Sequence, residues 1–221
     1  DEYEYCRAIG KSSKEPMIAV KHLSTERFAG GILAVANHVA NFSENVTLVT
    51  VLGTKNTQQE FIETQINASI QKKFFYKSES PTIVKRRLVE EYFFTKLIEV
   101  YDMEDTPLSE SDDRQLCEFL EANIEMFDAV IVVDFGHGTL TNNAVDIICR
   151  KSEFLVVNSQ ANAGNMGYNT LSKYSRADYA CVGEPEIRLE ARDRYGDLQE
   201  IISSTSNYSV VHDSYVLYCY S

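Results

Sequence analysis

The stretch Ala129-Val-Ile-Val-Val-Asp-Phe-Gly-His-Gly138 joins an uninterrupted apolar run to an Asp and two glycines. β-Branched residues without polar alternation are typical of a strand that is buried on both faces of a parallel sheet. Asp134 and the glycines that follow predict a tight turn at the carboxyl end of this strand, where open α/β sheets place their ligands. Similar apolar runs occupy residues 46–52, 154–157 and 179–182. The sequence therefore predicts several strands of one parallel sheet.

Segments with helical periodicity lie between these strands. The segment 109–127 opens with Ser109 and has Asp112 three residues later, which is close to a capping box, and then repeats apolar residues on one face. Three further helices are predicted at residues 31–42, 141–151 and 186–203. Strands that alternate with helices of this length predict an α/β fold with a doubly wound, mostly parallel sheet flanked by helices.

Two regions interrupt this alternation. Residues 2–23 and 82–101 are rich in Tyr, Phe, Val and Lys, and parts of them alternate apolar with polar side chains. That pattern favours antiparallel strands with one exposed face, which would form a small sheet outside the main one. Because no linker or internal repeat separates the segments, we expect residues 1–221 to form a single domain with this β extension.

The charge of the chain excludes one class of partner. Lys and Arg number 21 and Asp and Glu number 33, so the formal net charge is −12. A nucleic-acid surface needs clustered cations, so we expect no nucleic-acid partner.

No apolar run reaches the ~20 residues of a membrane span, so we expect no membrane association and a soluble, cytoplasmic protein. The five cysteines are widely spaced, which favours free thiols in a reducing compartment over disulfides or a zinc site.

The common nucleotide and hydrolase signatures are absent from the sequence. Its ten glycines form neither a Walker loop nor a G-x-G-x-x-G dinucleotide fingerprint. H-E-x-x-H and G-x-S-x-G are absent too, which excludes zincin and α/β-hydrolase interpretations. Candidate ligand contacts must then come from glycines and polar residues at strand ends.

Several loops carry such residues, and each loop allows two interpretations. Gly30-Gly31 precedes a helix, so its backbone amides either meet a ligand oxygen or belong to an ordinary loop. His137 is either an acid/base group or a solvated loop histidine. The asparagine-rich segment 158–169 either suits sugar hydroxyls and phosphates or is a run of turns. The carboxylates of Glu184-Pro-Glu186 either bind a magnesium nucleotide or cap the following helix.

Six motifs in a fixed order carry a family resemblance. They are Asp1-Glu-Tyr, Phe28-Ala-Gly-Gly31, the run 46–53, Thr82-Ile-Val-Lys85-x-Arg87, the segment 101–109 with Thr106-Pro-Leu-Ser109, and Asp134-Phe-Gly-His-Gly-x-Leu-Thr141. In this order they resemble the ribokinase/PfkB carbohydrate kinases, and most closely the branch with the sugar kinase domain of bifunctional ADP-heptose synthase-like proteins. The resemblance extends from Asp1 to about Cys219. It implies a central sheet flanked by helices and a β lid that closes over the sugar.

The resemblance also implies roles for individual residues. Asp1 would bind sugar hydroxyls, with Gly30 and Gly31 packed against the sugar. Lys85 and Arg87 would lie on the lid near a sugar phosphate, a role that also suits their charge. A sugar or sugar phosphate is therefore the implied substrate.

Other implied roles lie at the strand ends. Asp134 would lie beside the substrate. ATP and Mg²⁺ are the implied cofactors, with Asn158 and Glu186 as nucleotide contacts and Glu186 as a metal ligand. Of the family's N-x-x-E element only this Glu remains, within Gly183-Glu-Pro-Glu186.

The chain departs from the family pattern at several positions. Ala34 replaces the usual Asn after the diglycine, and His137 replaces a Lys in the turn. Residues 210–216 stand where a T-x-G-x-x-G nucleotide turn is expected, but no glycine follows Gly196. The G-x-G-D motif, which supplies the anion hole and the base in the family, is absent. We therefore expect this chain to be an incomplete domain that carries the sugar-side half, with the ATP-side part missing.

These observations leave three hypotheses. The first is a carbohydrate kinase that uses ATP to phosphorylate a hydroxyl of a sugar or sugar phosphate. The second is a non-catalytic relative that binds a sugar or sugar phosphate without transfer, which the substitutions at Ala34 and His137 favour. The third is an interaction module, a homodimer in which exposed lid strands pair edge to edge.

Overall fold

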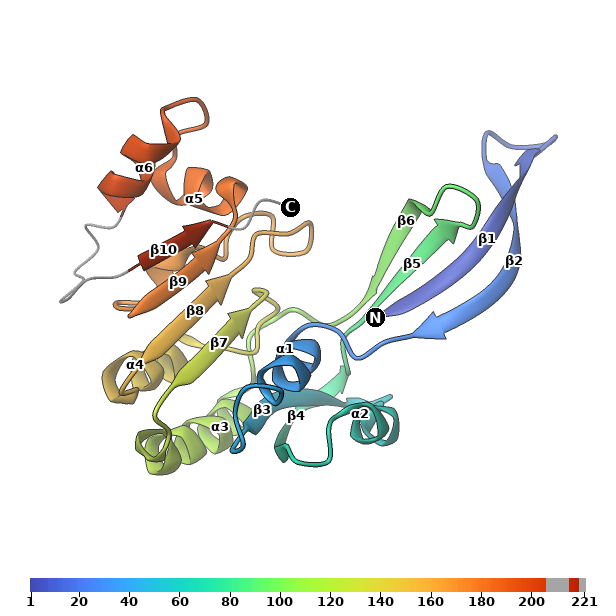
Figure 1. Ribbon diagram of the computed structural model, residues 1–221. Helices are drawn as coiled ribbons and strands as arrows, with labels where there is room; N and C mark the ends of the chain where they lie inside the picture. The colour runs from blue at the N-terminus through green and yellow to red at the C-terminus, as the bar shows by residue number, and fades with distance from the viewer. Residues whose placement is uncertain (206–214, 219–221) are drawn as a thin grey trace. The chain divides into compact units, whose positions relative to one another are not determined.

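The computed structural model describes residues 1–205 and 215–218 (Figure 1). The chain divides into two compact units, Asp1–Glu104 and Asp105–Ser221. Both units combine helices with parallel strand pairs, which confirms the predicted α/β fold class. Residues 210–214, part of the segment that stands where a nucleotide turn is expected, lie outside the described residues.

The first sheet of unit 1, here called the N-terminal sheet, has the strand order β2-β1-β5-β6. Its strands are β1 Glu2–Lys11, β2 Ile18–Arg27, β5 Val84–Glu90 and β6 Thr95–Asp102. β1 pairs with β2, and β5 with β6, in antiparallel fashion, whereas β1 and β5 run parallel. The two regions with alternating sequence thus form one sheet, and the expectation of purely antiparallel strands is wrong for its central pair.

The register of the N-terminal sheet brings distant residues to one face. Tyr3 on β1 lies opposite Arg87 on β5, and Arg87 lies opposite Glu99 on β6. Lys85 lies opposite Tyr101 in the same pairing. Because side chains alternate between the faces of a strand, these residues project from the same face. Strand pairing therefore gathers charged and aromatic side chains from three strands.

Two parallel strands, β3 Thr47–Lys55 and β4 Gln71–Pro81, form the second sheet of unit 1, next to the helices α1 Ile32–Val39 and α2 Gln59–Gln65. Their shared core consists of Ala36, Leu48, Leu52, Ile62, Ile66 and Ile70. Gly53 permits the close approach of the chain after β4, because a Cβ there would lie 2.1 Å from a backbone carbon of Pro81. The sequence does not predict α2 or β4, since α2 buries only Ile62 and β4 is mostly exposed.

Unit 2 contains a parallel sheet with the strand order β10-β9-β8-β7. Its strands are β7 Val130–Asp134, β8 Leu155–Ser159, β9 Tyr179–Val182 and β10 Tyr215–Tyr218. Leu155 and Val157 are completely buried, as the apolar run that contains them predicts for a central strand. Three of these strands therefore match the predicted apolar runs, whereas the fourth run, 46–52, lies in β3, which pairs with β4 in unit 1 and not with these strands.

The helices of unit 2 are α3 Glu110–Asn123, α4 Asn142–Lys151, α5 Glu184–Ala191 and α6 Leu198–Thr205, with the short 3₁₀ turns η1 Ile124–Met126 and η2 Leu171–Lys173. The hydroxyl of Ser109 caps α3 by accepting a hydrogen bond from the amide of Asp112 at 3.2 Å, which confirms the predicted N-cap. Thr141 caps α4 in the same way. None of the helices in the described part of the chain has both the length and the apolar character needed to cross a bilayer.

The expectation of one helix over residues 186–203 is wrong, because two helices occupy this region. α5 ends at Ala191, where Arg192 takes up the left-handed conformation with φ 54° and ψ 31°. The carboxylate of Asp193 then accepts hydrogen bonds from the amides of Tyr195 and Gly196 at 3.0 and 2.7 Å. These side-chain-to-backbone bonds stabilise a turn in place of a continued helix.

Candidate functional site

Asp1 lies directly beside the first glycine of the diglycine pair. The amide of Phe28 donates a hydrogen bond to the carbonyl of Asp1 at 2.9 Å, and the Asp1 amino nitrogen donates to the carbonyl of Phe28 at 3.0 Å. These bonds bring the Asp1 carboxylate so near that a Cβ on Gly30 would lie 2.1 Å from its Oδ2. Gly31 then starts α1 with φ 55° and ψ −131°, a conformation open essentially to glycine alone.

Arg87 holds the Asp1 carboxylate in place. Its Nη1 lies 3.0 Å from Asp1 Oδ1 and its Nε lies 2.6 Å from Glu99 Oε2. The guanidinium also lies 5.3 Å from the centroid of the Tyr3 ring, and only 14% of the side chain is exposed. Arg87 is therefore neutralised by two carboxylates, and it fixes one oxygen of Asp1 while no described residue donates a hydrogen bond to Oδ2.

Lys85 and Tyr101 lie on the same face of the N-terminal sheet. The Lys85 ammonium lies 4.8 Å from the centroid of the Tyr101 ring. Burial lowers the pKa of Lys85, and the Glu99 carboxylate opposes this shift. Burial and a hydrogen bond to Glu99 raise the pKa of Tyr101 to about 12, so its hydroxyl stays protonated. We call Asp1, Tyr3, Lys85, Arg87, Glu99 and Tyr101 the Asp1 cluster, which has two cations and two carboxylates.

Asp134 is a buried carboxylate whose two oxygens are both bonded within unit 2. Oδ1 accepts a hydrogen bond from the amide of Gly136 at 2.9 Å. Oδ2 accepts from the ammonium of Lys173 at 2.9 Å and from the hydroxyl of Tyr174 at 2.8 Å. Burial and the Asp134 charge raise the pKa of Tyr174, which keeps this donor protonated. Asp134 therefore holds the turn after β7 to η2.

The asparagine-rich loop 158–169 supports the same turn. Asn162 and Asn165 both donate side-chain hydrogen bonds to the carbonyl of Phe135, at 2.8 and 2.9 Å, and Asn169 donates to the carbonyl of Asp134 at 2.9 Å. The sequence left open whether this loop binds a ligand or is a run of turns, and the structure shows turns that are bonded internally. Asn158 also donates internally, to the carbonyl of Cys181 at 2.8 Å.

His137 is buried, with 7% of its surface exposed, so the reading as a solvated loop histidine is wrong. The same turn contains Gly138, where a Cβ would lie 2.1 Å from the carbonyl oxygen of Thr106. The two glycines of this turn have φ values of 67° and 76°, a region in which other residues are strained. Gly136 and Gly138 are thus required by the backbone conformation and the close packing of this turn.

Glu186 bonds to a loop and not to its own helix. Its Oε1 accepts a hydrogen bond from the amide of Ala161 at 3.1 Å, while Glu184 pairs with Arg188 at 2.8 Å. Among residues 1–205 and 215–218, no group of three or more His, Cys, Asp or Glu side chains is placed to hold a metal ion. These residues therefore do not by themselves supply a complete site for Mg²⁺ around Glu186.

Sequence reasoning missed several partners of the predicted residues. Glu99, Tyr101 and Tyr3 join the Asp1 cluster only through the strand register, which no sequence spacing reveals. Lys173 and Tyr174 bond to Asp134 from about forty residues away in the chain. The alternation in residues 82–101 does place Lys85 and Arg87 on one face, but it does not indicate what lies opposite them.

We predict that Asp134→Asn destabilises unit 2 by about 3 kcal/mol, because the Lys173 ammonium loses its buried counter-ion and the amide places a donor among other donors. Urea unfolding followed by far-UV circular dichroism measures this change. Asp146→Asn is the matched control, since Asp146 is exposed and lies 3.8 Å from Arg150. Equal losses of stability in the two variants would contradict the role assigned to Asp134.

Comparisons with known proteins agree with this architecture. No family model matches the chain. The bifunctional protein HldE of Chromohalobacter salexigens is 31% identical over 141 residues, which cover 63% of this chain and 29% of that protein. Ribokinase from Giardia lamblia superposes with a TM-score of 0.64 at 18% identity, over 99% of this chain and 67% of its own.

Phosphofructokinase-2 from Escherichia coli, in complex with fructose-6-phosphate, gives a TM-score of 0.64 at 12% identity, over 93% of this chain and 66% of that chain. The chain thus spans about two thirds of these kinase structures and less than a third of the curated relative. Its structural neighbours are sugar kinases. The chain has the ribokinase-like fold, and its resemblance to the ribokinase/PfkB carbohydrate kinases, indicated by the order of its motifs, is confirmed.

Proposed function

We propose that this chain is the sugar-binding part of a PfkB-type carbohydrate kinase and that a sugar or sugar phosphate binds at the Asp1 cluster. One observation carries the proposal. Arg87 holds Asp1 Oδ1 at 3.0 Å, and Oδ2 lies against Gly30 with no hydrogen bond from a described residue. A fixed carboxylate with an acceptor oxygen suits a sugar hydroxyl, and the missing Cβ of Gly30 makes room for this carboxylate.

The charge balance of the cluster supports a hydroxyl-rich ligand. Its two cations are offset by Asp1 and Glu99, so it does not attract an anion by net charge alone. One of these two cations is the ammonium of Lys85, which is not paired with a carboxylate as Arg87 is and lies at the ring of Tyr101, an apolar surface. A sugar that carries a phosphate meets both requirements, since its hydroxyls need acceptors and its phosphate needs a cation.

The relatives are consistent with this ligand class. One structural neighbour is a phosphofructokinase-2 in complex with fructose-6-phosphate, and another is a ribokinase. Both names describe kinases of sugars or sugar phosphates. Fructose 6-phosphate is accordingly the first probe for this chain.

Phosphoryl transfer from ATP and Mg²⁺ is the second part of the proposal. Within it, Glu186 and Asn158 contribute to the nucleotide side, where Glu186 Oε2 lies beside Gly183. The 221 residues contain no G-x-G-D motif, and the described residues supply no complete metal site, so no step of transfer is assigned to them. A non-catalytic sugar-binding relative is therefore the alternative, and the substitutions at Ala34 and His137 favour it.

We predict that fructose 6-phosphate raises the thermal unfolding temperature of the chain and that Asp1→Asn weakens its binding about 10- to 100-fold, the cost of one charge-assisted hydrogen bond. Isothermal titration measures both dissociation constants. Glu91→Gln is the control, because Glu91 forms only an exposed ion pair with Arg7 at 3.1 Å. Unchanged affinity in Asp1→Asn would refute the assignment of the sugar to this cluster.

Fructose 6-phosphate also distinguishes a kinase, which transfers a phosphoryl group, from a relative that only binds the sugar. Formation of a bisphosphate product by the purified chain with ATP and Mg²⁺ supports the kinase. Stabilisation by fructose 6-phosphate without any response to ATP and Mg²⁺ supports the non-catalytic relative.

We predict that binding of fructose 6-phosphate weakens with rising pH as Lys85 loses its proton. Burial lowers the pKa of this lysine below its usual 10.5, so the loss begins at a lower pH than for a solvated lysine. The affinity should fall up to about 10-fold between about pH 7 and pH 10. Lys85→Arg should weaken the dependence, because a guanidinium stays protonated and leaves only the amino group of Asp1, whose pKa burial lowers below its usual 8.0, to titrate in this range. The same pH profile in both proteins would show that Lys85 does not contact the phosphate.

Self-association through the N-terminal sheet is a further part of the proposal. β2 and β6 are its edge strands, and both carry exposed apolar residues, Ile18 and Ile98, while Phe93 and Phe94 are exposed at the β5–β6 turn. Exposed edges with apolar side chains are pairing surfaces. One structural neighbour is described as a tetrameric form, of phosphofructokinase-2 from Escherichia coli.

We predict a homodimer at tens of micromolar in analytical ultracentrifugation, and its dissociation in the double variant Ile18→Lys/Ile98→Lys. A monomer at all concentrations would exclude the dimer.

Among the described cysteines, Cys6, Cys117, Cys149 and Cys181 form no disulfide, which suits the cytoplasmic location that the sequence predicts.

A further inference from the structure

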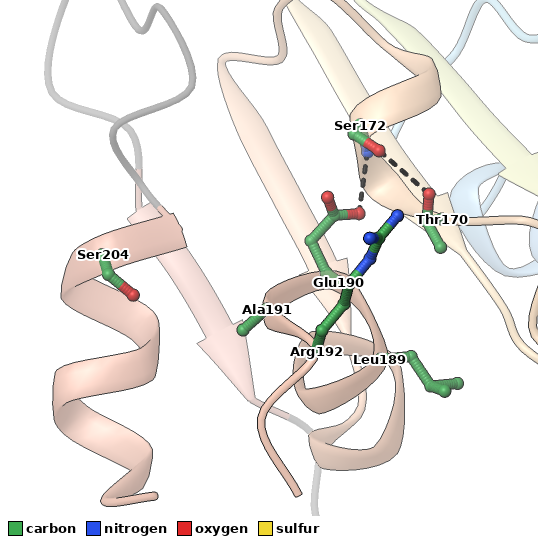
Figure 2. Close-up of a pocket in the computed structure, with 7 residues that line it drawn as sticks. All are labelled: Thr170, Ser172, Leu189, Glu190, Ala191, Arg192 and Ser204. Carbon is green, nitrogen blue, oxygen red and sulfur yellow. Dashed lines mark hydrogen bonds between the residues drawn. The ribbon is translucent and has the colours of Figure 1, made fainter.

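A cavity of about 410 Å³ lies in unit 2, where the C-terminal end of α5 approaches the loop around η2 and the helix α6 (Figure 2). This volume falls in the range of small-molecule sites. None of its lining residues belongs to the Asp1 cluster or to the Asp134 turn. The proposed sugar site therefore leaves this cavity unexplained.

One end of the cavity carries hydrogen-bond donors. No hydrogen bond or ion pair joins the guanidinium of Arg192 to any residue in the described part of the chain. Figure 2 shows this guanidinium directed toward the hydroxyls of Thr170 and Ser172. These hydroxyls lie 2.9 Å apart and share one hydrogen bond, so one of their two hydrogens remains for a ligand. The donors suit a carboxylate or another oxyanion.

Hydrogen-bond acceptors lie beside these donors. The amide of Ser172 donates to Glu190 Oε2 at 2.9 Å, which holds the carboxylate at the cavity wall, and no described residue donates to Oε1. The hydroxyl of Ser204 donates to the carbonyl of Ile201 at 2.8 Å, so only its lone pairs face a ligand. The negative end of the α5 dipole adds to this acceptor character. These groups suit an ammonium or hydroxyl donor.

The formal charge of the lining is zero, because one guanidinium offsets one carboxylate. A phosphate ester with two negative charges would face Glu190 and the end of α5 without a second cation. A ligand that carries one anionic and one cationic group matches both ends. We propose that this cavity binds a free α-amino acid, with its carboxylate on Arg192 and its ammonium on Glu190. The side chains of Leu189 and Ala191 then supply apolar surface for the amino acid side chain.

The backbone of Arg192 allows a variant that removes the guanidinium without harming the fold. Arg192 is in the left-handed region, which glycine occupies with less strain, and its amide caps α5 by donating to the carbonyls of Arg188 and Leu189. Arg192→Gly keeps this amide and relieves the strain. Glu190→Gln keeps an oxygen for the Ser172 amide, removes the charge and replaces the second acceptor oxygen with an amide donor.

The test titrates the full chain with each of the twenty common amino acids, at up to about 10 mM, by thermal shift and then by isothermal calorimetry. We expect at least one amino acid to bind and to raise the unfolding temperature by a few degrees. Arg192→Gly and Glu190→Gln should each weaken that binding at least about 10-fold, without a lower unfolding temperature of the free protein.

Arg194→Ala is the matched control, because Arg194 stacks on Tyr195 at 5.4 Å and does not line the cavity. Its affinity for the amino acid should be unchanged. Absence of binding by every amino acid would overturn the proposal. Binding of inorganic phosphate or glucose 6-phosphate that Arg192→Gly abolishes would also overturn it, because the cavity would then be an anion site. Failure here leaves the Asp1 cluster untouched, since the two sites share no residue.

Discussion

The parallel pairing of β1 with β5 is the interaction on which the proposed sugar site depends. It sets Tyr3 opposite Arg87 and so brings the start of the chain within reach of a guanidinium that follows more than eighty residues later. Arg87 then bridges Asp1 at 3.0 Å and Glu99 at 2.6 Å. A shift of the register by one residue would turn Arg87 to the opposite face, and the carboxylate of Asp1 would lose its anchor.

The carboxylates of the two units are used differently. Asp134 is buried and both of its oxygens have internal donors, so it holds the turn after β7 and the loop that follows β8. Asp1 is partly exposed and only one of its oxygens is anchored. A carboxylate whose two oxygens both have internal donors stabilises a loop, whereas a carboxylate with one oxygen that lacks a donor can accept a hydrogen bond from a ligand. This contrast makes Asp1 the stronger candidate for a substrate contact.

The sequence predicts those parts of the fold that local patterns determine. The apolar runs that became β7, β8 and β9, and the hydroxyl caps of α3 and α4, follow from side-chain chemistry within a few residues. The break between α5 and α6 was missed because the Asp193 turn competes with helical periodicity. The partners Glu99 and Tyr101 could not be predicted, because strand register is a long-range property. Burial of His137 likewise depends on residues distant in the chain.

We propose above all that a sugar hydroxyl donates a hydrogen bond to Oδ2 of Asp1. A crystal structure of the chain with bound fructose 6-phosphate tests it most directly. We predict a sugar hydroxyl about 2.6–3.0 Å from Asp1 Oδ2, a contact between the sugar and Gly30, and an intact bond from Arg87 to Oδ1. A sugar bound elsewhere, or an Asp1 carboxylate that contacts only Arg87 in the complex, would contradict the account.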